Sequence, residues 1–252
     1  MTLLSIRNLT KAFGGHQAVR GLSFSVAPGE IVALIGPNGA GKTTCFNMLN
    51  GQIRPDHGEI VLDGTDVAGW APERMWRMGV GRGFQIAATF ASMTVRDNVR
   101  TALLSRHRAV WRFFRPASDL FTAEADAILD RVGLRDLAEQ GCGTLAYGEL
   151  KRLELALAIS NTPRLLLADE PTAGMTPADR HTAMDLLVAM ARRDGCAVVF
   201  TEHDTDTVFR VADRILVMDK GELIAEGNAA SIRASRRVRT AYLGDDGVTD
   251  AI

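Results

Sequence analysis

The sequence predicts an α/β fold in which a mixed β-sheet carries helices on both faces. Two observations predict it. An apolar run at 31–35 leads into a glycine-rich loop and then into a helix-compatible run at 45–49. A second apolar run, at 165–168, ends at two carboxylates, Asp169 and Glu170. Such runs are typical of buried strands in parallel sheets, where ligands bind beyond the carboxyl ends of the strands.

The composition narrows the class of protein. With 252 residues, 46% of them hydrophobic, the chain is long enough for one α/β domain with a substantial core. The formal net charge is -1, so no global basic field indicates nucleic acid as a partner. Cys45, Cys142 and Cys196 match no metal spacing and are expected to be free thiols in a reducing compartment. No apolar run approaches the roughly 20 residues that span a bilayer, so a role at a membrane is expected to pass through a partner.

The glycine-rich loop matches the phosphate-loop pattern G-x-x-x-x-G-K-[ST] in its required strand–loop–helix context. Its residues are Gly36, Pro37, Asn38, Gly39, Ala40, Gly41, Lys42, Thr43 and Thr44. The glycines let the backbone turn tightly and direct several N–H groups to one point, and the following helix adds partial positive charge there. Lys42 is predicted to reach the β- and γ-phosphates of a nucleotide, and Thr43 to place its hydroxyl on Mg²⁺.

The chain opens with antiparallel β-structure instead of a βαβ unit. Strand-like runs occur at 3–9, 19–26 and 59–62, and they predict an antiparallel part over about 1–30 and 59–70.

A turn is expected at 11–15, between the first two strands, and Phe13 falls in it. Two interpretations of Phe13 stay open at this point. Its ring is placed either to stack on a purine or to close the hairpin as a half-buried hydrophobe.

A helical subdomain over about 86–160 is predicted to interrupt the β-rich order. Helices are expected from Thr94, at 123–132 and at 149–159, with a loop at 141–149 before the last. The last helix is predicted to be amphipathic, with an apolar face of Leu150, Leu153 and Leu157 opposite a charged face of Lys151, Arg152 and Glu154.

A basic and aromatic stretch at 106–116 lies within that subdomain. It is either a contact for a membrane surface or a partner, or an insertion that uses its arginines for solubility.

Two carboxylates and one histidine are predicted to meet the phosphate loop. Asp169 and Glu170 end a buried strand, so Asp169 is expected to hold Mg²⁺ and Glu170 to polarise an attacking water. His203 stands just beyond another apolar run, at 197–201, where it can contact the γ-phosphate. A solvated acidic turn and a structural histidine are the alternatives, and the upstream phosphate loop disfavours the first.

These residues resemble the ATP-binding subunits of ABC transporters, and the resemblance covers nearly the whole chain. The loop at 36–43 is similar to their Walker A motif, and 165–170 to their Walker B motif with its catalytic glutamate. Phe13, Gln85 and His203 fall where that family has its base-stacking aromatic, its Q-loop glutamine and its switch histidine. The family's signature position is occupied by Leu145, Ala146, Tyr147, Gly148 and Glu149.

The resemblance implies a single ABC ATPase domain over 1–252, with a C-terminal tail at about 228–252. In the family two chains dimerise head to tail, and each ATP lies between the phosphate loop of one chain and the signature segment of the other. The implied partners are transmembrane permease subunits, a paralogous ATPase subunit or a second copy of this chain, and indirectly a substrate-binding protein. The implied location is peripheral, at the cytoplasmic face of the cell membrane.

The resemblance also implies the chemistry. ATP and Mg²⁺ are the implied cofactors, and hydrolysis of ATP is the implied reaction. The implied catalytic residues are Lys42, Glu170 and His203, and the implied Mg²⁺ ligands are Thr43, Gln85 and Asp169.

Two departures from the family pattern stand out. Ala146 and Tyr147 replace the usual serine and first glycine of the signature, so no hydroxyl is available to a γ-phosphate there. Thr176 stands where the family's D-loop has aspartate. The chain therefore lacks the carboxylate through which the two protomers of the family communicate at this position.

The altered signature is similar to that of the branched-chain amino acid subgroup, of the LivG type. So are 13–15, 82–85, the insertion around Trp111 and the tail at 241–244. This resemblance implies import of branched-chain amino acids or related small amides and amino acids; the substrate itself is chosen by other subunits.

Two other functions stay open at this point. One is an ABC ATPase that acts on a soluble partner. The single cassette, the absence of sustained heptads and the near-neutral charge argue against it. The other is a weakly hydrolysing, nucleotide-dependent binding module, against which the presence of both Glu170 and His203 argues.

Overall fold

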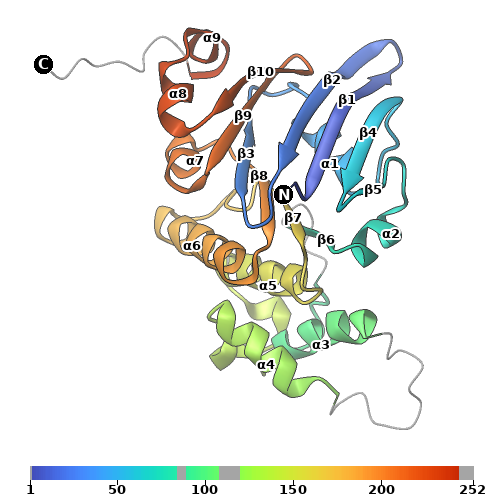
Figure 1. Cartoon of the computed structure of the whole chain (residues 1–252). Coiled ribbons are helices and arrows are strands. Elements are labelled where there is room, and N and C mark those ends of the chain that lie inside the picture. The colour runs from blue at the N-terminus through green and yellow to red at the C-terminus, as the bar shows by residue number, and fades with distance from the viewer. Residues whose placement is uncertain (1, 84–88, 108–119, 244–252) are drawn as a thin grey trace, which may run out of the picture.

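The computed structural model describes residues 2–83, 89–107 and 120–243. Two sheets dominate this part of the chain (Figure 1). The first is antiparallel, in the order β2-β1-β4-β5, and the second is mixed, in the order β10-β9-β3-β8-β7-β6. Within the second sheet β10 alone runs antiparallel to its neighbour, and the other pairs are parallel. The predicted mixed sheet is therefore confirmed.

The strands of the antiparallel sheet are β1 (Leu4–Phe13), β2 (His16–Val26), β4 (His57–Leu62) and β5 (Thr65–Asp66). The strands of the mixed sheet are β3 (Ile31–Ile35), β6 (Val80–Gly83), β7 (Leu165–Asp169), β8 (Ala197–Thr201), β9 (Arg214–Asp219) and β10 (Glu222–Gly227). The helices are α1 (Lys42–Leu49), α2 (Pro72–Arg77), α3 (Val95–Arg106), α4 (Thr122–Arg131), α5 (Tyr147–Ile159), α6 (Pro177–Asp194), α7 (Thr205–Val211), α8 (Ala229–Ala234) and α9 (Arg236–Val238). Two 3-10 turns, η3 (Arg135–Leu137) and η4 (Cys142–Thr144), and one π-helical segment, η5 (Arg239–Leu243), complete the described elements.

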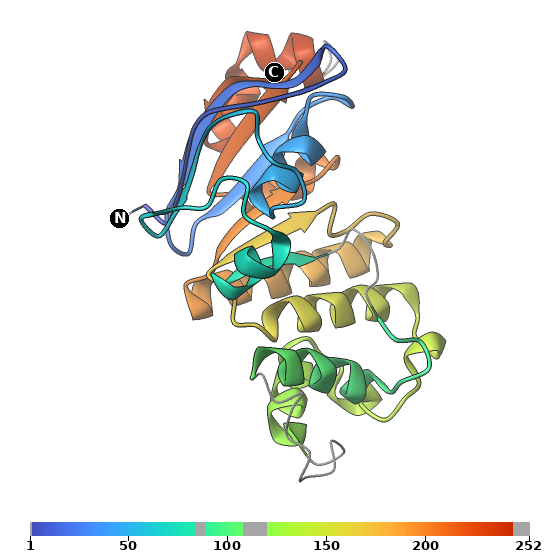
Figure 2. The same cartoon turned by 90° about the vertical axis from the view of Figure 1, so that its right-hand side faces the viewer.

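The mixed sheet is buried on both faces, and alternation along β3 shows which element covers each face. Ile31, Ala33 and Ile35 pack into one core cluster together with residues of α5 and α6. Val32 and Leu34 pack into a second cluster together with α1 and the antiparallel sheet. Successive side chains of a strand point to opposite faces, so a continuous apolar run of this kind requires a layer on each side. Figures 1 and 2 show the resulting layers.

The first hairpin is tighter than predicted. β1 continues to Phe13, which pairs with His16, so the expected turn at 11–15 is wrong. The actual turn is Gly14–Gly15, and both glycines have positive φ, at 52° and 88°. Two consecutive left-handed residues allow the tight type of hairpin turn, and glycine adopts that conformation without strain.

Helix α5 differs from the prediction in its start and in its faces. It begins at Tyr147, whereas the sequence predicted a loop to residue 149. The predicted charged face is also wrong, because Lys151 and Glu154 are buried and their side chains pair at 3.0 Å. α5 packs against α3, α4 and α6 as well as β6. These neighbours cover the side of the helix that the sequence predicted to face solvent. Two short helices, α2 and α7, were not predicted.

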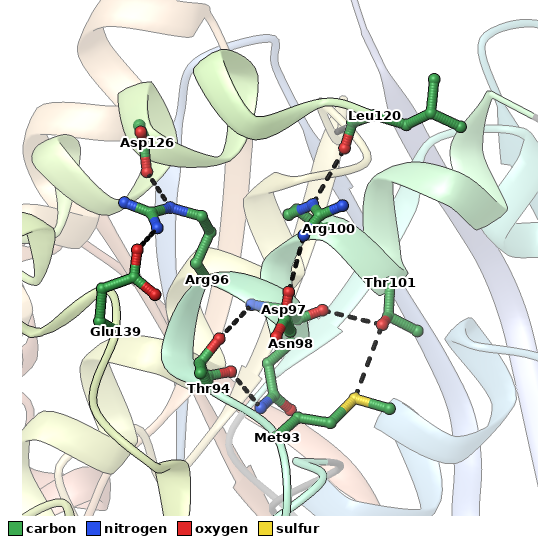
Figure 3. A network of polar contacts seen from close by, with 10 residues as sticks. All are labelled: Met93, Thr94, Arg96, Asp97, Asn98, Arg100, Thr101, Leu120, Asp126 and Glu139. Atoms are coloured by element: carbon green, nitrogen blue, oxygen red, sulfur yellow. Dashed lines mark hydrogen bonds and ion pairs between the residues drawn. The ribbon is translucent and has the colours of Figure 1, made fainter. Parts of the chain in front are cut away.

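α3 and α4 lie at the end of the molecule away from the first hairpin (Figures 1 and 2). A polar network fastens them together, as Figure 3 shows. The Thr94 hydroxyl accepts from the Asp97 N–H at 3.1 Å and caps α3. Arg96 on α3 donates to Asp126 on α4 at 2.6 Å and also pairs with Glu139. Arg100 donates to the Leu120 carbonyl at 3.0 Å.

Among the helices in residues 2–83, 89–107 and 120–243, none combines the length and the hydrophobicity that a membrane span requires.

We expect the three thiols to be unreactive in the folded protein. Cys45, Cys142 and Cys196 are free and buried. Burial raises the pKa of Cys45 to about 12, and burial together with the charge of Asp194 raises the pKa of Cys196 to about 12. Since the thiolate is the reactive form, titration with Ellman's reagent at pH 8 should detect no thiol in the native chain and three in denaturant. Rapid labelling of the native chain would contradict this packing, and Cys45→Ser should leave two thiols in denaturant.

Candidate nucleotide site

Three neighbouring parallel strands deliver the predicted polar residues to one edge of the mixed sheet. β8 lies between β3 and β7. The phosphate loop follows β3, while Asp169 and Glu170 end or follow β7, and His203 follows β8. Asp169 is in register with Thr201, so the ends of β7 and β8 are level. The carboxyl edge of an α/β sheet is the usual place for a ligand site.

Two glycines of the phosphate loop are required by close backbone approach. A β-carbon on Gly36 would lie 2.0 Å from the carbonyl oxygen of Met218, and one on Gly41 would lie 2.3 Å from that of Ala18. Both have positive φ, at 149° and 100°. The loop is thereby packed against β9 and β2, while Asn38 and Gly39 at its tip are exposed.

Lys42 is folded into the phosphate loop. Its ammonium donates to the carbonyl of Gly36 at 2.6 Å and to that of Pro37 at 3.1 Å. Burial lowers the pKa of Lys42, and the negative charges of Glu170 and Asp169 act in the opposite direction. The ammonium is therefore held by carbonyl oxygens, within electrostatic reach of both carboxylates.

Asp169 is held from two sides. The Thr201 hydroxyl donates to Oδ1 of Asp169 at 2.7 Å. The Arg82 guanidinium lies 3.5 Å from Oδ2 and also donates to the side chains of Asn47, at 2.8 Å, and Gln52, at 2.6 Å. Burial lowers the pKa of Arg82, and Asp169 partly offsets that shift. Arg82 therefore connects the carboxylate to the segment at the end of α1.

Glu170 and His203 face each other at the open side of the site. Nε2 of His203 lies 2.9 Å from Oε1 of Glu170, and both side chains are half exposed. Glu170 has a positive φ of 49°, which turns the chain away from β7. Its N–H donates to the hydroxyl of Thr201 at 3.0 Å, which holds that turn. The sequence predicted both residues at one sheet edge, and the structure places them there; their direct contact was not predicted.

The signature segment packs on the residues that follow Glu170. The Tyr147 hydroxyl donates to the Ala173 carbonyl at 3.0 Å, and a β-carbon on Gly148 would lie 3.1 Å from Cγ of Asp179. Ala146 is the N-cap residue directly before α5, and its N–H donates to the Glu149 carboxylate at 2.8 Å. The remaining signature residue, Leu145, precedes the helix. Among the described residues, no hydrogen bond or ion pair joins this segment to the phosphate loop.

Three other predicted features stand as follows. Gln85 lies outside the described residues. Phe13 ends β1 with 47% of its surface exposed, beside the strand whose Ala18 contacts the phosphate loop. Of the basic stretch at 106–116, Arg106 and His107 are described, and both contact Glu124 on α4.

The side chains at this edge fit a hard divalent cation. Thr43 is exposed at the start of α1, and it offers a hydroxyl. Asp169 keeps Oδ2, whose contact in the described part of the chain is the long one to Arg82. Oxygen donors of this kind suit Mg²⁺.

Sequence reasoning missed Arg82, Thr201 and Glu202. Arg82 and Thr201 contact Asp169 directly, and Glu202 accepts hydrogen bonds from Thr172. For Thr201 and Glu202 the available signal was position, because they lie at the end of a buried strand immediately before His203. Arg82 carried no signal of its own, since its role depends on the pairing of β6 with β7.

Comparisons with known proteins agree with this geometry. The ABC transporter family model matches residues 19–173, and the model of the branched-chain amino acid ATP-binding cassette transporter matches 222–248. The high-affinity branched-chain amino acid transport ATP-binding protein BraF of Pseudomonas aeruginosa is 36% identical over 96% of this chain and 98% of its own length. LivG of Escherichia coli K12, which carries the same description, is 37% identical with the same coverage of both chains.

Solved structures give the same result. A nucleotide-free ATP-binding cassette from an ABC transporter superposes with a TM-score of 0.85 at 28% identity, covering 97% of this chain and 100% of that one. A dimeric cassette in a post-hydrolysis state, bound to ADP and Pi, superposes with a TM-score of 0.75 at 25% identity. That match covers 89% of this chain and 98% of the other.

Proposed function

The chain belongs to the family of ABC transporter ATP-binding proteins, which hydrolyse ATP to power transport, and we propose that it serves an importer of branched-chain amino acids or related small amino acids and amides. The observation that carries the substrate class is the double match to that subgroup. A subgroup model covers 222–248, and relatives named for branched-chain amino acid transport match over 96% of the chain.

The catalytic part of the proposal assigns three side chains. Lys42 exchanges its carbonyl partners for the β- and γ-phosphate oxygens of ATP. Glu170 accepts a hydrogen bond from the attacking water and orients it in line with the γ-phosphate. His203, which lies 2.9 Å from Glu170, holds the γ-phosphate and the glutamate in one geometry.

Mg²⁺ completes the proposed site. Bound Mg²⁺ neutralises charge on the phosphate oxygens. Thr43 and Asp169, together with Gln85, would hold it, and Thr201 fixes the orientation of the Asp169 carboxylate.

The proposed assembly is a head-to-tail dimer with a second copy or a paralogous chain. Each ATP then lies between one phosphate loop, at 36–44, and the partner's signature segment at the start of α5. Within one chain, no hydrogen bond or ion pair among the described residues joins the signature segment to the phosphate loop, so a second chain is needed to bring the two motifs to one nucleotide. The dimeric form of a related cassette also supports the proposal. An interfacial ATP stabilises such a dimer by linkage.

The proposed contact with the permease is a cavity between α2, β6 and the end of α3, lined by both polar and apolar side chains. Its volume is about 640 Å³, and its lining includes Trp76, Arg77, Arg82 and Arg106. Arg82 also approaches Asp169, so a permease segment in this cavity would lie next to a residue of the nucleotide site. The chain would then work at the cytoplasmic face of the membrane, with a substrate-binding protein as an indirect partner.

Co-purification tests the proposed function. The tagged chain would be isolated from gently solubilised membranes, and its partners identified by mass spectrometry. We expect multi-helix permease chains, and a second ATPase if the partner is a paralogue. An active preparation with soluble partners alone would contradict the importer and favour an ATPase that acts on a soluble partner. A phosphate-release assay of the same preparation distinguishes these two ATPases, the importer subunit and the one with a soluble partner, from a non-hydrolysing binding module.

A further inference from the structure

Glu202 is a buried carboxylate at the end of β8 that none of the assigned steps uses. It is 5% exposed and lies between Thr201, which holds Asp169, and His203. In the part of the chain that the structure describes, no lysine, arginine or histidine forms an ion pair with it. Burying a carboxylate without a cation is costly unless several donors bind it.

Backbone N–H groups and a hydroxyl bind the Glu202 carboxylate in place of a cation. Oε1 of Glu202 accepts from the N–H of Thr172 at 2.9 Å and from its hydroxyl at 2.6 Å. Oε2 accepts from the N–H of His203 at 3.3 Å. Thr172 is itself 1% exposed, so its bonds to Glu202 are shielded from water. One carboxylate thus connects two segments that are 30 residues apart in sequence.

Those two segments carry Glu170 and His203, the pair that the proposed function assigns to the γ-phosphate and the attacking water. Thr172 lies in the turn that follows Glu170, and that turn is closed by the Ala173 N–H donating to the Glu170 carbonyl at 3.1 Å. His203 directly follows Glu202 in the chain. Because Glu170 and His203 are both half exposed, little packing on their own side chains fixes their 2.9 Å separation.

The C-terminal segment also approaches this carboxylate. Tyr242 is half-buried against the main core cluster. Burial and, to a smaller extent, the negative charge of Glu202 raise the pKa of its phenol. Glu202 is therefore bound by the turn after Glu170 and lies within electrostatic reach of Tyr242 in η5.

We propose that Glu202 is a positioning residue, whose carboxylate holds the turn after Glu170 and the backbone of His203 in the relative geometry that ATP hydrolysis requires. The inference rests on the proposed roles of Glu170 and His203. Glu202 does not touch the nucleotide in this account, so its loss should affect the hydrolytic step and leave ATP binding nearly unchanged.

The test compares substitutions that alter one hydrogen bond each, in the complex purified with its membrane partners. In Glu202→Gln the amide oxygen can retain both bonds from Thr172, but the amide NH₂ then faces the N–H of His203, donor against donor. Thr172→Val removes the hydroxyl bond and preserves the N–H bond. Thr172→Ser keeps both donors and is the matched control.

We expect Glu202→Gln and Thr172→Val to lower kcat by about 10-fold to 100-fold, because small misplacements of reacting groups carry losses of that order. KM for ATP and the thermal midpoint should stay close to wild type, and Thr172→Ser should retain its kcat. A wild-type kcat in Glu202→Gln would overturn the inference. So would parallel losses of kcat, ATP affinity and thermal midpoint, which indicate a purely structural carboxylate. Absence of hydrolysis in the wild-type complex would instead contradict the proposed function itself.

Discussion

Replacing Glu170 by Gln is expected to lower kcat for ATP hydrolysis by at least about 100-fold, while ATP binding is retained. The amide has nearly the same shape as the carboxylate, but it cannot accept a hydrogen bond from water through both of its terminal atoms. The contact to His203 at 2.9 Å can be kept by either group, so the site should remain assembled. Phosphate release at saturating ATP measures the effect on kcat.

The same variant should accumulate the ATP-bound dimer, because ATP at the interface is no longer consumed. Size-exclusion chromatography with light scattering, with and without ATP, measures the dimer. Glu59→Gln is the matched control, since Glu59 is an exposed carboxylate on β4, outside the sheet edge that carries the site. Hydrolysis at the wild-type rate in Glu170→Gln would remove Glu170 from the catalytic role.

Replacing Lys42 by Ala is expected to weaken ATP binding by about 10-fold to 100-fold, the range for a lost charge-assisted hydrogen bond. Lys42 is the cation folded into the phosphate loop, at 2.6 Å from the Gly36 carbonyl. Burial disfavours the Lys42 ammonium, as its lowered pKa indicates, so the hydrogen bonds lost with it are offset and the thermal midpoint should change little. Titration with a fluorescent ATP analogue measures the affinity.

Lys220→Ala is the control for Lys42. Lys220 is exposed in the β9–β10 turn, and the next residue, Gly221, donates its N–H to the Ala40 carbonyl of the phosphate loop. The control therefore removes a positive charge close to the loop without removing the predicted phosphate contact. Equal affinities in wild type and Lys42→Ala would undo the assignment of the phosphate loop.

Local sequence patterns predicted the elements that bear the site. β3 and β8 have the predicted bounds, because β3 is a continuous apolar run between Glu30 and Gly36 and β8 is a short apolar run that ends at Thr201 before Glu202. The loop at 36–44 has a required order of residue types, and two of its glycines, Gly36 and Gly41, have no room for a side chain. Where function demands a residue type at a fixed spacing, one sequence is sufficient to find it.

Tertiary contacts explain what the sequence could not predict. Lys151 and Glu154 have the spacing of a solvated helix face, but neighbouring helices and β6 cover that face. Arg82 contacts Asp169 on a neighbouring strand that is remote in sequence, so no local pattern distinguishes it from a surface residue. Glu202 had only its position before His203 as a signal, because its contact with Thr172 joins segments 30 residues apart. The position of Phe13 shifted for a simpler reason, since the two-glycine turn lets β1 run further than expected.

The most direct test of the account is phosphate release by the complete complex in lipid vesicles, with a branched-chain amino acid-binding protein on the opposite side of the membrane from this chain. The account predicts that leucine-loaded binding protein raises the rate several-fold, and that Glu170→Gln abolishes the stimulated rate. Equal rates with and without loaded binding protein would contradict the claim that ATP hydrolysis at this site drives import of this substrate class.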